Sequence, residues 1–105
     1  MARRTMKVVE EEAWSWTLLA EGEAHYLSVL CGTSAVYEFD VALTAEEIAQ
    51  YRREGRAYAA KLASAVSDSP RAYQARHIAD FHARPEVRAA IAAWRQSASA
   101  GKTPA

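Results

Sequence analysis

The fold is decided by residues 14–31, which read WSWTLLAEGEAHYLSVLC. From Trp14 to Leu18, large apolar side chains alternate with smaller polar ones, which is the pattern of a strand with one buried face. The sequence Glu-Gly-Glu at 21–23 predicts a turn, because glycine adopts positive φ angles without a steric cost. Residues 24–31 form a second alternating run, so the two strands are expected to pair as antiparallel neighbours.

A third strand is expected over residues 36–43, after a turn at residues 32–34. The row of this strand that contains Phe39 must face the core, since the other row contains carboxylates that would be costly to bury unpaired. By the same reasoning, the rows of Trp14 and His25 in the first two strands face inward. The opposite face is expected to stay open and shows Ser15, Thr17, Leu19, Tyr26, Ser28, Leu30, Val36, Glu38 and Asp40.

The apolar period changes to that of a helix after the third strand. Residues 44–47, Thr-Ala-Glu-Glu, predict a capping box in which the threonine hydroxyl and the second glutamate satisfy free backbone amides. We expect one long helix from there to about Ser67, in which Gly55 allows the close approach of a bulky sheet residue. A second helix is predicted to start at Pro70, and Pro85 starts a last short amphipathic segment.

These patterns predict an α+β fold with a three- or four-stranded antiparallel meander. Residues 6–9 either add a fourth strand or begin a bent first one. A long helix and one or two shorter C-terminal helices follow, all packed on one face of the sheet. The length of 105 residues fits one domain. We expect a flexible N-terminus over residues 1–5, a single domain over 6–96 and a disordered tail over 97–105.

Composition excludes several classes of protein. Thirteen basic and thirteen acidic residues cancel, so the whole-chain charge does not favour nucleic acid or an anionic membrane. A single cysteine excludes an internal disulfide framework. No apolar run approaches the ~20 residues that span a bilayer, and no secretory signal is present. We therefore expect a cytoplasmic protein that binds no cofactor.

The charges are nevertheless unevenly distributed along the chain. Residues 1–54 carry ten acidic and five basic residues, whereas residues 55–105 carry eight basic and three acidic ones. The sheet half is therefore acidic and the helical half basic. An acidic-aromatic segment runs from Glu10 to Trp16 and is interpreted as a solvated lead-in to a strand. An acidic surface of this kind would attract a partner with a basic surface.

The candidate chemical groups do not form a catalytic set in the sequence. Cys31 lies six residues after His25 on the same strand face, which separates the two by ~20 Å. His77 and Asp80 share a helical face, but His82 points elsewhere, and no zinc-ligand spacing is present. We therefore expect neither an enzyme nor a metal site.

An anion-binding or nucleotide-binding site is the alternative that the basic half favours. Guanidinium groups hold phosphates in a fork-like geometry, and the C-terminal half contains several of them. Nucleic acid is not an expected partner, because no recognition motif accompanies the regional charge. The residues of this alternative site are Arg71, Arg76, His77 and Arg84.

Four segments carry a resemblance to known proteins: WSWTLL at 14–19, YLSVLCG at 26–32, VYEF at 36–39 and LTAEEI at 43–48. Together they resemble small uncharacterised bacterial proteins, and the chain is similar in kind to immunity proteins, which neutralise a cognate toxin. The resemblance extends over roughly residues 6–95. It implies a non-enzymatic protein that acts by binding another protein.

The expected partner surface is the open sheet face together with its acidic rim. An aromatic anchor inside a ring of charged groups is a common arrangement of binding hot spots. A small homodimeric protein is the other alternative, formed through unpaired sheet edges or through a patch of Tyr26, Leu30 and Val36. The residues of the expected partner surface are Glu21, Glu23, Tyr26, Leu30, Glu38 and Asp40.

Overall fold

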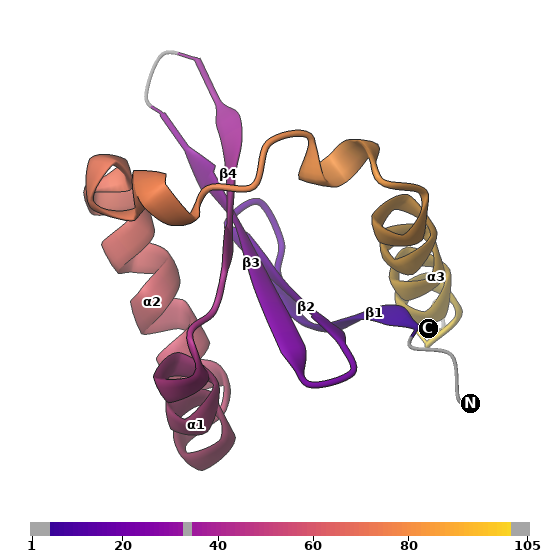
Figure 1. The fold of residues 1–105 in the computed structure, drawn as a ribbon. Coiled ribbons are helices and arrows are strands. Elements are labelled where there is room, and N and C mark those ends of the chain that lie inside the picture. The colour runs from indigo at the N-terminus through magenta and orange to yellow at the C-terminus, as the bar shows by residue number, and fades with distance from the viewer. Residues whose placement is uncertain (1–4, 33–34, 102–105) are drawn as a thin grey trace.

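A computed structural model describes residues 5–32 and 35–101, with side chains as far as Ser97. Its sheet has four antiparallel strands in the order of the sequence (Figure 1). The predicted meander is thus confirmed, and the segment around residues 6–9 adds a fourth strand. The strands are β1 (Met6–Glu12), β2 (Trp16–Glu21), β3 (Ala24–Cys31) and β4 (Tyr37–Ala42).

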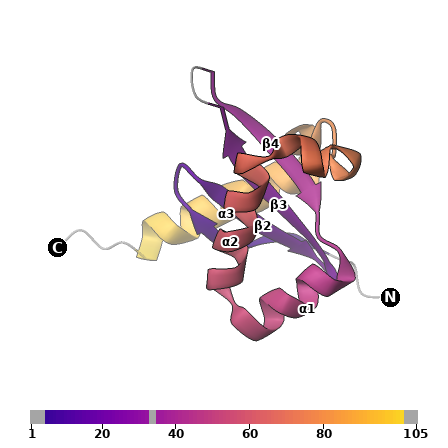
Figure 2. The ribbon, with the colours of Figure 1, turned by 90° about the vertical axis from the view of Figure 1, so that its left-hand side faces the viewer.

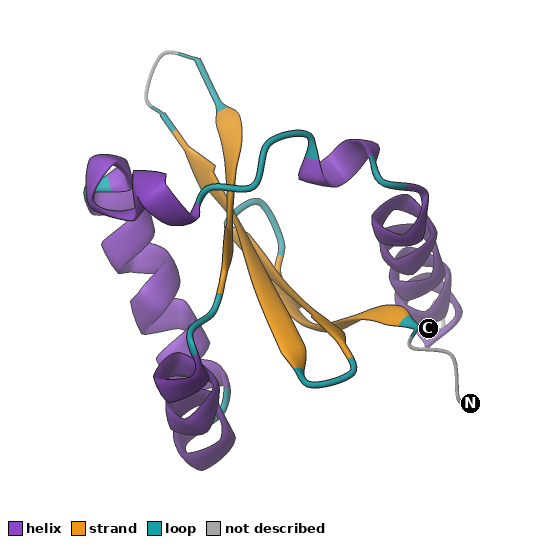
Figure 3. Cartoon of the chain, viewed as in Figure 1, coloured by secondary structure: helices purple, strands orange, loops and turns teal. Residues whose placement is uncertain are grey.

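Helices follow the sheet, as Figure 3 shows, and the α+β fold class is confirmed. Two α-helices come first, then two short 3₁₀ helices that cross the edge of the sheet, and finally a long α-helix. The helices are α1 (Ala45–Glu54), α2 (Arg56–Asp68), η1 (Pro70–Arg76), η2 (Phe81–Ala83) and α3 (Pro85–Gly101). No helix in the described part of the chain has the length and apolar character that crossing a bilayer requires.

The helices cover both faces of the sheet, so the prediction that they pack on one face is wrong. Leu18 and Leu19 are neighbours on β2, and both are almost fully buried. Leu18 packs with α2 residues such as Leu62, whereas Leu19 packs with Phe81 of η2 and Val87 of α3. Figures 1 and 2 show α2 and α3 on opposite sides of the sheet. We call these sides the α2 face and the α3 face.

The inward rows predicted for the strands lie on the α2 face, with one exception. His25 and Phe39 are buried there, as expected. Trp14 is instead 92% exposed, because it lies in the turn before β2 and not in the strand. Its backbone has a φ of 65°, which extended strands do not adopt. The alternation that seemed to include Trp14 therefore starts at Trp16.

The predicted long helix is two helices separated at Gly55. This residue has φ 69° and ψ −145°, a conformation that is essentially restricted to glycine. A Cβ built at Gly55 would meet no atom within 4 Å. The glycine is therefore needed for its backbone angles, and the expected close approach of a sheet residue is absent.

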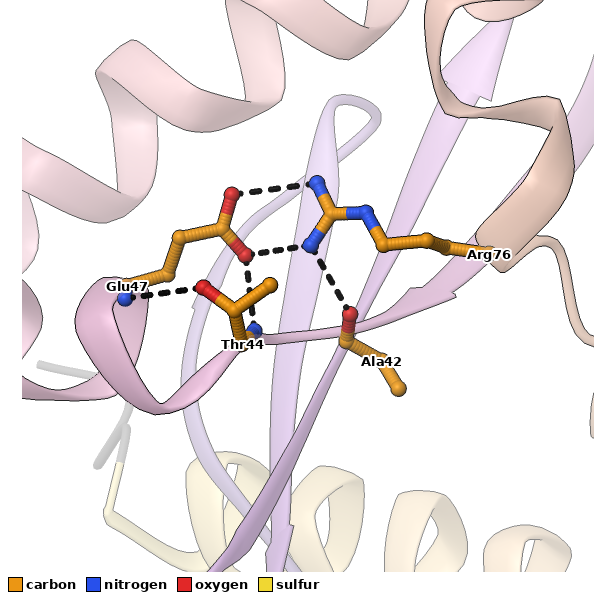
Figure 4. Close-up of polar contacts among 4 residues, drawn as sticks. All are labelled: Ala42, Thr44, Glu47 and Arg76. Carbon is orange, nitrogen blue, oxygen red and sulfur yellow. Dashed lines mark hydrogen bonds and ion pairs between the residues drawn. The ribbon is translucent and has the colours of Figure 1, made fainter.

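The predicted capping box at the start of α1 is confirmed, and it belongs to a larger network (Figure 4). The Glu47 amide donates to the Thr44 hydroxyl at 3.1 Å, and the Thr44 amide donates to the Glu47 carboxylate at 2.9 Å. Both Nη atoms of Arg76 donate hydrogen bonds to the same carboxylate, at 2.6 and 3.0 Å. It also donates to the Ala42 carbonyl. This network joins the end of β4, the start of α1 and the end of η1.

The ends of the chain differ in part from the predicted ones. The tail expected to be disordered from residue 97 is helical as far as Gly101, because its alanines continue α3 at little cost. Residues 102–105 lie outside the described part of the chain, as do residues 1–4 of the predicted flexible N-terminus and residues 33–34 of the predicted turn.

Candidate functional site: an acidic cleft beside Trp14

One end of the sheet gathers the large apolar side chains that the fold leaves in solvent. In an antiparallel meander, the β1–β2 turn and the β3–β4 connection lie at the same end. We call this the Trp14 end. Trp14 is 92% exposed there, Val36 68% and Tyr37 49%. Exposed large apolar side chains that gather in one region of a protein are candidates for contact with a partner.

A cleft of about 470 Å³ lies beside Trp14 on the α3 face. Its floor is formed by cross-strand neighbours, including the pair of Leu30 and Glu38. The β1–β2 turn forms one wall, and α3 contributes Arg95. The lining of the Trp14 cleft includes the side chains of Glu11, Glu12, Trp14, Leu30, Glu38 and Arg95.

The lining of the Trp14 cleft contains three carboxylates and one guanidinium, so its charge is negative. Glu11 is held in place by the Trp94 indole N–H at 3.0 Å and the Thr17 hydroxyl at 3.2 Å. Glu12 lies at the rim, 3.3 Å from the exposed Arg56. Glu38 on the floor is about half exposed, so the carboxylates of both Glu12 and Glu38 are within reach of a ligand.

His82 contacts two residues of the cleft, Ser28 and Glu38, and also the buried Asp40. Its Nε2 atom is 2.8 Å from the Ser28 hydroxyl, 3.2 Å from Oδ1 of Asp40 and 3.3 Å from Oε2 of Glu38. The hydrogen bond to Asp40 raises the pKa of His82 above its usual value, although burial and Arg95 act in the opposite direction. When His82 is protonated, it supplies a positive charge next to the buried Asp40 carboxylate.

Ser28, His82 and Asp40 are the residue types of a hydrolytic triad, but their geometry is not that of one. A triad needs the serine on one ring nitrogen and the carboxylate on the other, so that the free nitrogen can accept the serine proton. Here all partners meet at Nε2. Among the described residues, no carboxylate contacts the other ring nitrogen of His82, so nothing orients this ring as the base that Ser28 would need.

The predicted partner surface is only partly assembled, because the face on which it was placed is covered. Leu30 and Glu38 line the Trp14 cleft. Tyr26 packs against Phe81 with ring centroids 5.3 Å apart, and Asp40 is only 5% exposed. The rim residues are at the opposite end of the sheet, where Glu21 ends β2 and Glu23 lies in the β2–β3 turn.

The most exposed residue of the site was assigned to the core by its spacing. Trp14 fits the alternation of β2, and the turn at residues 13–15 contains no Gly, Pro, Asn or Asp that would have indicated it. Arg95 enters the site through the packing of α3 on the sheet, which no local pattern predicts. The acidic-aromatic segment from Glu10 to Trp16 was the available signal, and its residues line much of the cleft.

The four residues of the alternative anion site do not form one site. Arg76 is engaged by Glu47, and His77 stacks on Phe39 at 4.7 Å. Arg84 lies over the ring of Phe81 in the core of the α3 face. Arg71 borders a second hollow next to η1. Of these four residues, only Arg76 is in an ion pair with a carboxylate of the described part of the chain.

Cys31 and metal-binding residues offer no stronger candidate. Burial raises the pKa of the Cys31 thiol, although a hydrogen bond with Ser67 acts the other way, and a raised pKa makes a thiol a poor nucleophile. In residues 5–32 and 35–97, no three His, Cys, Asp or Glu side chains are placed to hold a metal ion. The Trp14 cleft is therefore the site that the geometry favours.

Comparisons of the chain with protein-family models, curated proteins and solved structures find no match.

Proposed function

We propose that this chain is a protein-binding module that captures a basic segment of another protein in the Trp14 cleft. The observation that carries this proposal is the state of Trp14, which is 92% exposed in a backbone conformation with φ 65°. Bulky residues rarely adopt positive φ, and the conformation costs roughly 1–2 kcal/mol. An indole in water contributes almost no burial energy to folding. A partner that covers Trp14 would bury the indole, and this burial would offset the cost of the backbone conformation.

Charge complementarity indicates the chemistry of the partner. A Lys or Arg side chain can lie on the Trp14 indole face and pair with the carboxylates of Glu12 or Glu38. Cation–π contacts contribute about 0.5–1 kcal/mol at exposed sites and more once desolvated. Tryptophan is also among the residues most enriched in binding hot spots. The cleft combines an aromatic anchor with a charged rim, as a recognition site for a basic segment requires.

Within this class, we favour a cytoplasmic immunity or inhibitor protein that neutralises a cognate toxin without chemistry of its own. Toxins that act on nucleic acids or nucleotides carry basic groups near their active sites, and an acidic inhibitor can occupy such a site. As a small α+β chain with an acidic face, the protein is similar in kind to immunity proteins, which favours the same choice.

The experiment is a calorimetric titration with a candidate toxin domain, chosen as the product of the neighbouring gene. We expect Trp14→Ala to weaken binding by about 2 kcal/mol or more, as loss of a hot spot does. Glu38→Gln should weaken it less, and Trp14→Phe should retain part of it. Glu23→Gln is the matched control, because it removes an exposed carboxylate at the opposite end of the sheet. Equal affinities of the wild type and Trp14→Ala would exclude the cleft as the binding site.

A further inference from the structure

The two edges of the sheet differ in how they are protected. The edge at β1 contains a bulge between Val8 and Glu10, and α3 packs against this strand. Bulges and charged residues are the usual protection of an edge strand. The edge at β4 is covered only in its C-terminal half, where the chain itself adds an antiparallel bridge between His77 and Val41. There the Ile78 amide donates to the Asp40 carbonyl at 2.8 Å.

The N-terminal half of the same edge is open. Backbone groups of alternate residues point to the same side of a strand, so the outward carbonyl of Asp40 places the amide and carbonyl of Glu38 on the outer side as well. The Leu43 amide donates to His25 of β3, which confirms that odd-numbered residues face inward. Among the residues that the structure describes, no backbone hydrogen bond reaches Glu38 from outside the sheet. Val36 directly precedes β4 and is 68% exposed.

We propose that a second copy of the chain pairs with this open edge and forms a symmetric dimer. An antiparallel pairing of Val36 with Glu38 of the second copy, and the reverse, uses both open residues. It avoids Asp40, whose carbonyl is already occupied by Ile78. A twofold axis then passes at Tyr37, which lies opposite Tyr37 of the second copy. The edge is self-complementary in this register, as an isologous interface requires.

The side chains next to the edge also favour a second copy as the occupant. Tyr37 is 49% exposed and points to the α2 face, where an open hollow of about 540 Å³ begins. Tyr37, Phe39, Pro70 and Arg71 line this hollow. The ring of Tyr37 from the second copy would lie over it, close to the Arg71 guanidinium, which can pack on an aromatic face. The same pairing covers Val36.

This dimer borders the Trp14 cleft at Glu38, which lines the cleft and would lie beside Val36 of the second copy on the α3 face. Tyr37 and the hollow beside it lie on the α2 face, away from Trp14. The inference does not rest on the proposed function, because the test below measures self-association of the chain alone. Because only a short stretch of edge pairs, the dimer belongs to the weak class of interfaces that bury less than about 1,200 Å².

The test is sedimentation equilibrium of the intact chain over concentrations from about 10 µM to 1 mM, a range suited to weak association. We expect the wild type to dimerise within this range. Tyr37→Lys and Tyr37→Glu each place like charges opposite one another, and each should weaken the dimer at least about tenfold. An equimolar mixture of the two variants should recover association as a heterodimer, because the charges then match.

Trp14→Lys is the control, since it places a charge at the same end of the sheet but in the cleft. It should dimerise as the wild type does. A wild type that is monomeric at 1 mM would overturn the proposal. So would a mixture that associates no better than its components, provided that circular dichroism shows both variants to be folded.

Discussion

The imidazole of His82 and the carboxylate of Asp40 form a contact of 3.2 Å between Nε2 and Oδ1, which ties η2 to the middle of β4. Asp40 is almost fully buried, and His82 is its only cationic contact among the ion pairs of the described residues. When His82 is protonated, the two residues form a partly buried ion pair beside the cleft. Removing one partner of such a pair leaves the other charge uncompensated.

The stability of the fold should depend on pH through His82. Its pKa is raised in the folded state, so its contribution to stability is fully present below the unfolded value of about 6.5 and is lost as the pH rises through the folded value. Glu38, Arg95 and Ser28 surround the ring and act on the same equilibrium. Urea unfolding should show a decline above pH 6.5 that His82→Gln lacks. Parallel pH profiles of the two proteins would contradict this assignment.

The network in Figure 4 should contribute substantially to the free energy of unfolding. Burial alone would raise the pKa of Glu47, but hydrogen bonds from Arg76 and the Thr44 amide lower it. Its contribution is present above the unfolded value of about 4.5 and is lost as the pH falls through the lowered one. Arg76→Gln should cost about 1–3 kcal/mol near neutral pH in urea unfolding. The exposed Arg71→Gln is the control and should change stability by less than ~0.5 kcal/mol.

Gly55 separates α1 from α2, and its replacement distinguishes two helices from one. In a continuous helix, Gly55→Ala would stabilise the protein by up to about 1 kcal/mol. With φ 69° and ψ −145°, alanine is strained despite the open space, and we expect a loss of roughly 1–3 kcal/mol. The sign of the change in urea midpoint is the measurement. A gain in stability would contradict the break at Gly55.

Trp14 should be dispensable for folding. Its side chain is exposed and its φ of 65° suits glycine better than an aromatic residue. We expect Trp14→Gly to leave the free energy of unfolding unchanged within ~0.5 kcal/mol or to raise it, because relief of strain offsets the added freedom of the unfolded chain. Trp16→Gly is the contrasting variant, since it empties a buried site and should cost at least ~3 kcal/mol. Similar losses at both positions would show that Trp14 is a structural residue.

Most of the strands and the start of α1 were predictable from the sequence because their signals are local. Alternation from Trp16 onward and the capping box at Thr44 depend on residues two to four positions apart. The assignment of α3 to a face was different. Its apolar stripe, with Val87 and Ile91, fits either side of the sheet, and only the fully assembled core decides between them. The adjacent residues Leu18 and Leu19 indicated that both faces of the sheet are covered. Neighbouring side chains in a strand point to opposite faces, so two adjacent leucines are both buried only if each face has a cover.

The candidate site was less predictable for the same reason. Glu38 and Leu30 could be placed together by strand register, since they are direct cross-strand neighbours. Trp14 was misassigned because period-two spacing does not show where a strand begins. The cover over Asp40 comes from His82, 42 positions away in the sequence, and no spacing rule connects the two.

Binding of a basic segment in the Trp14 cleft can be observed by ¹⁵N-detected titration of the tryptophan indoles. The probe is a short peptide rich in Arg and Lys, with an acidic peptide of equal length as the control. We expect the basic peptide to shift the Trp14 indole signal, and the Trp94 signal through its bond to Glu11, while the acidic peptide shifts neither. A Trp14 signal that stays unmoved while the basic peptide binds elsewhere, or fails to bind, would contradict binding in the Trp14 cleft.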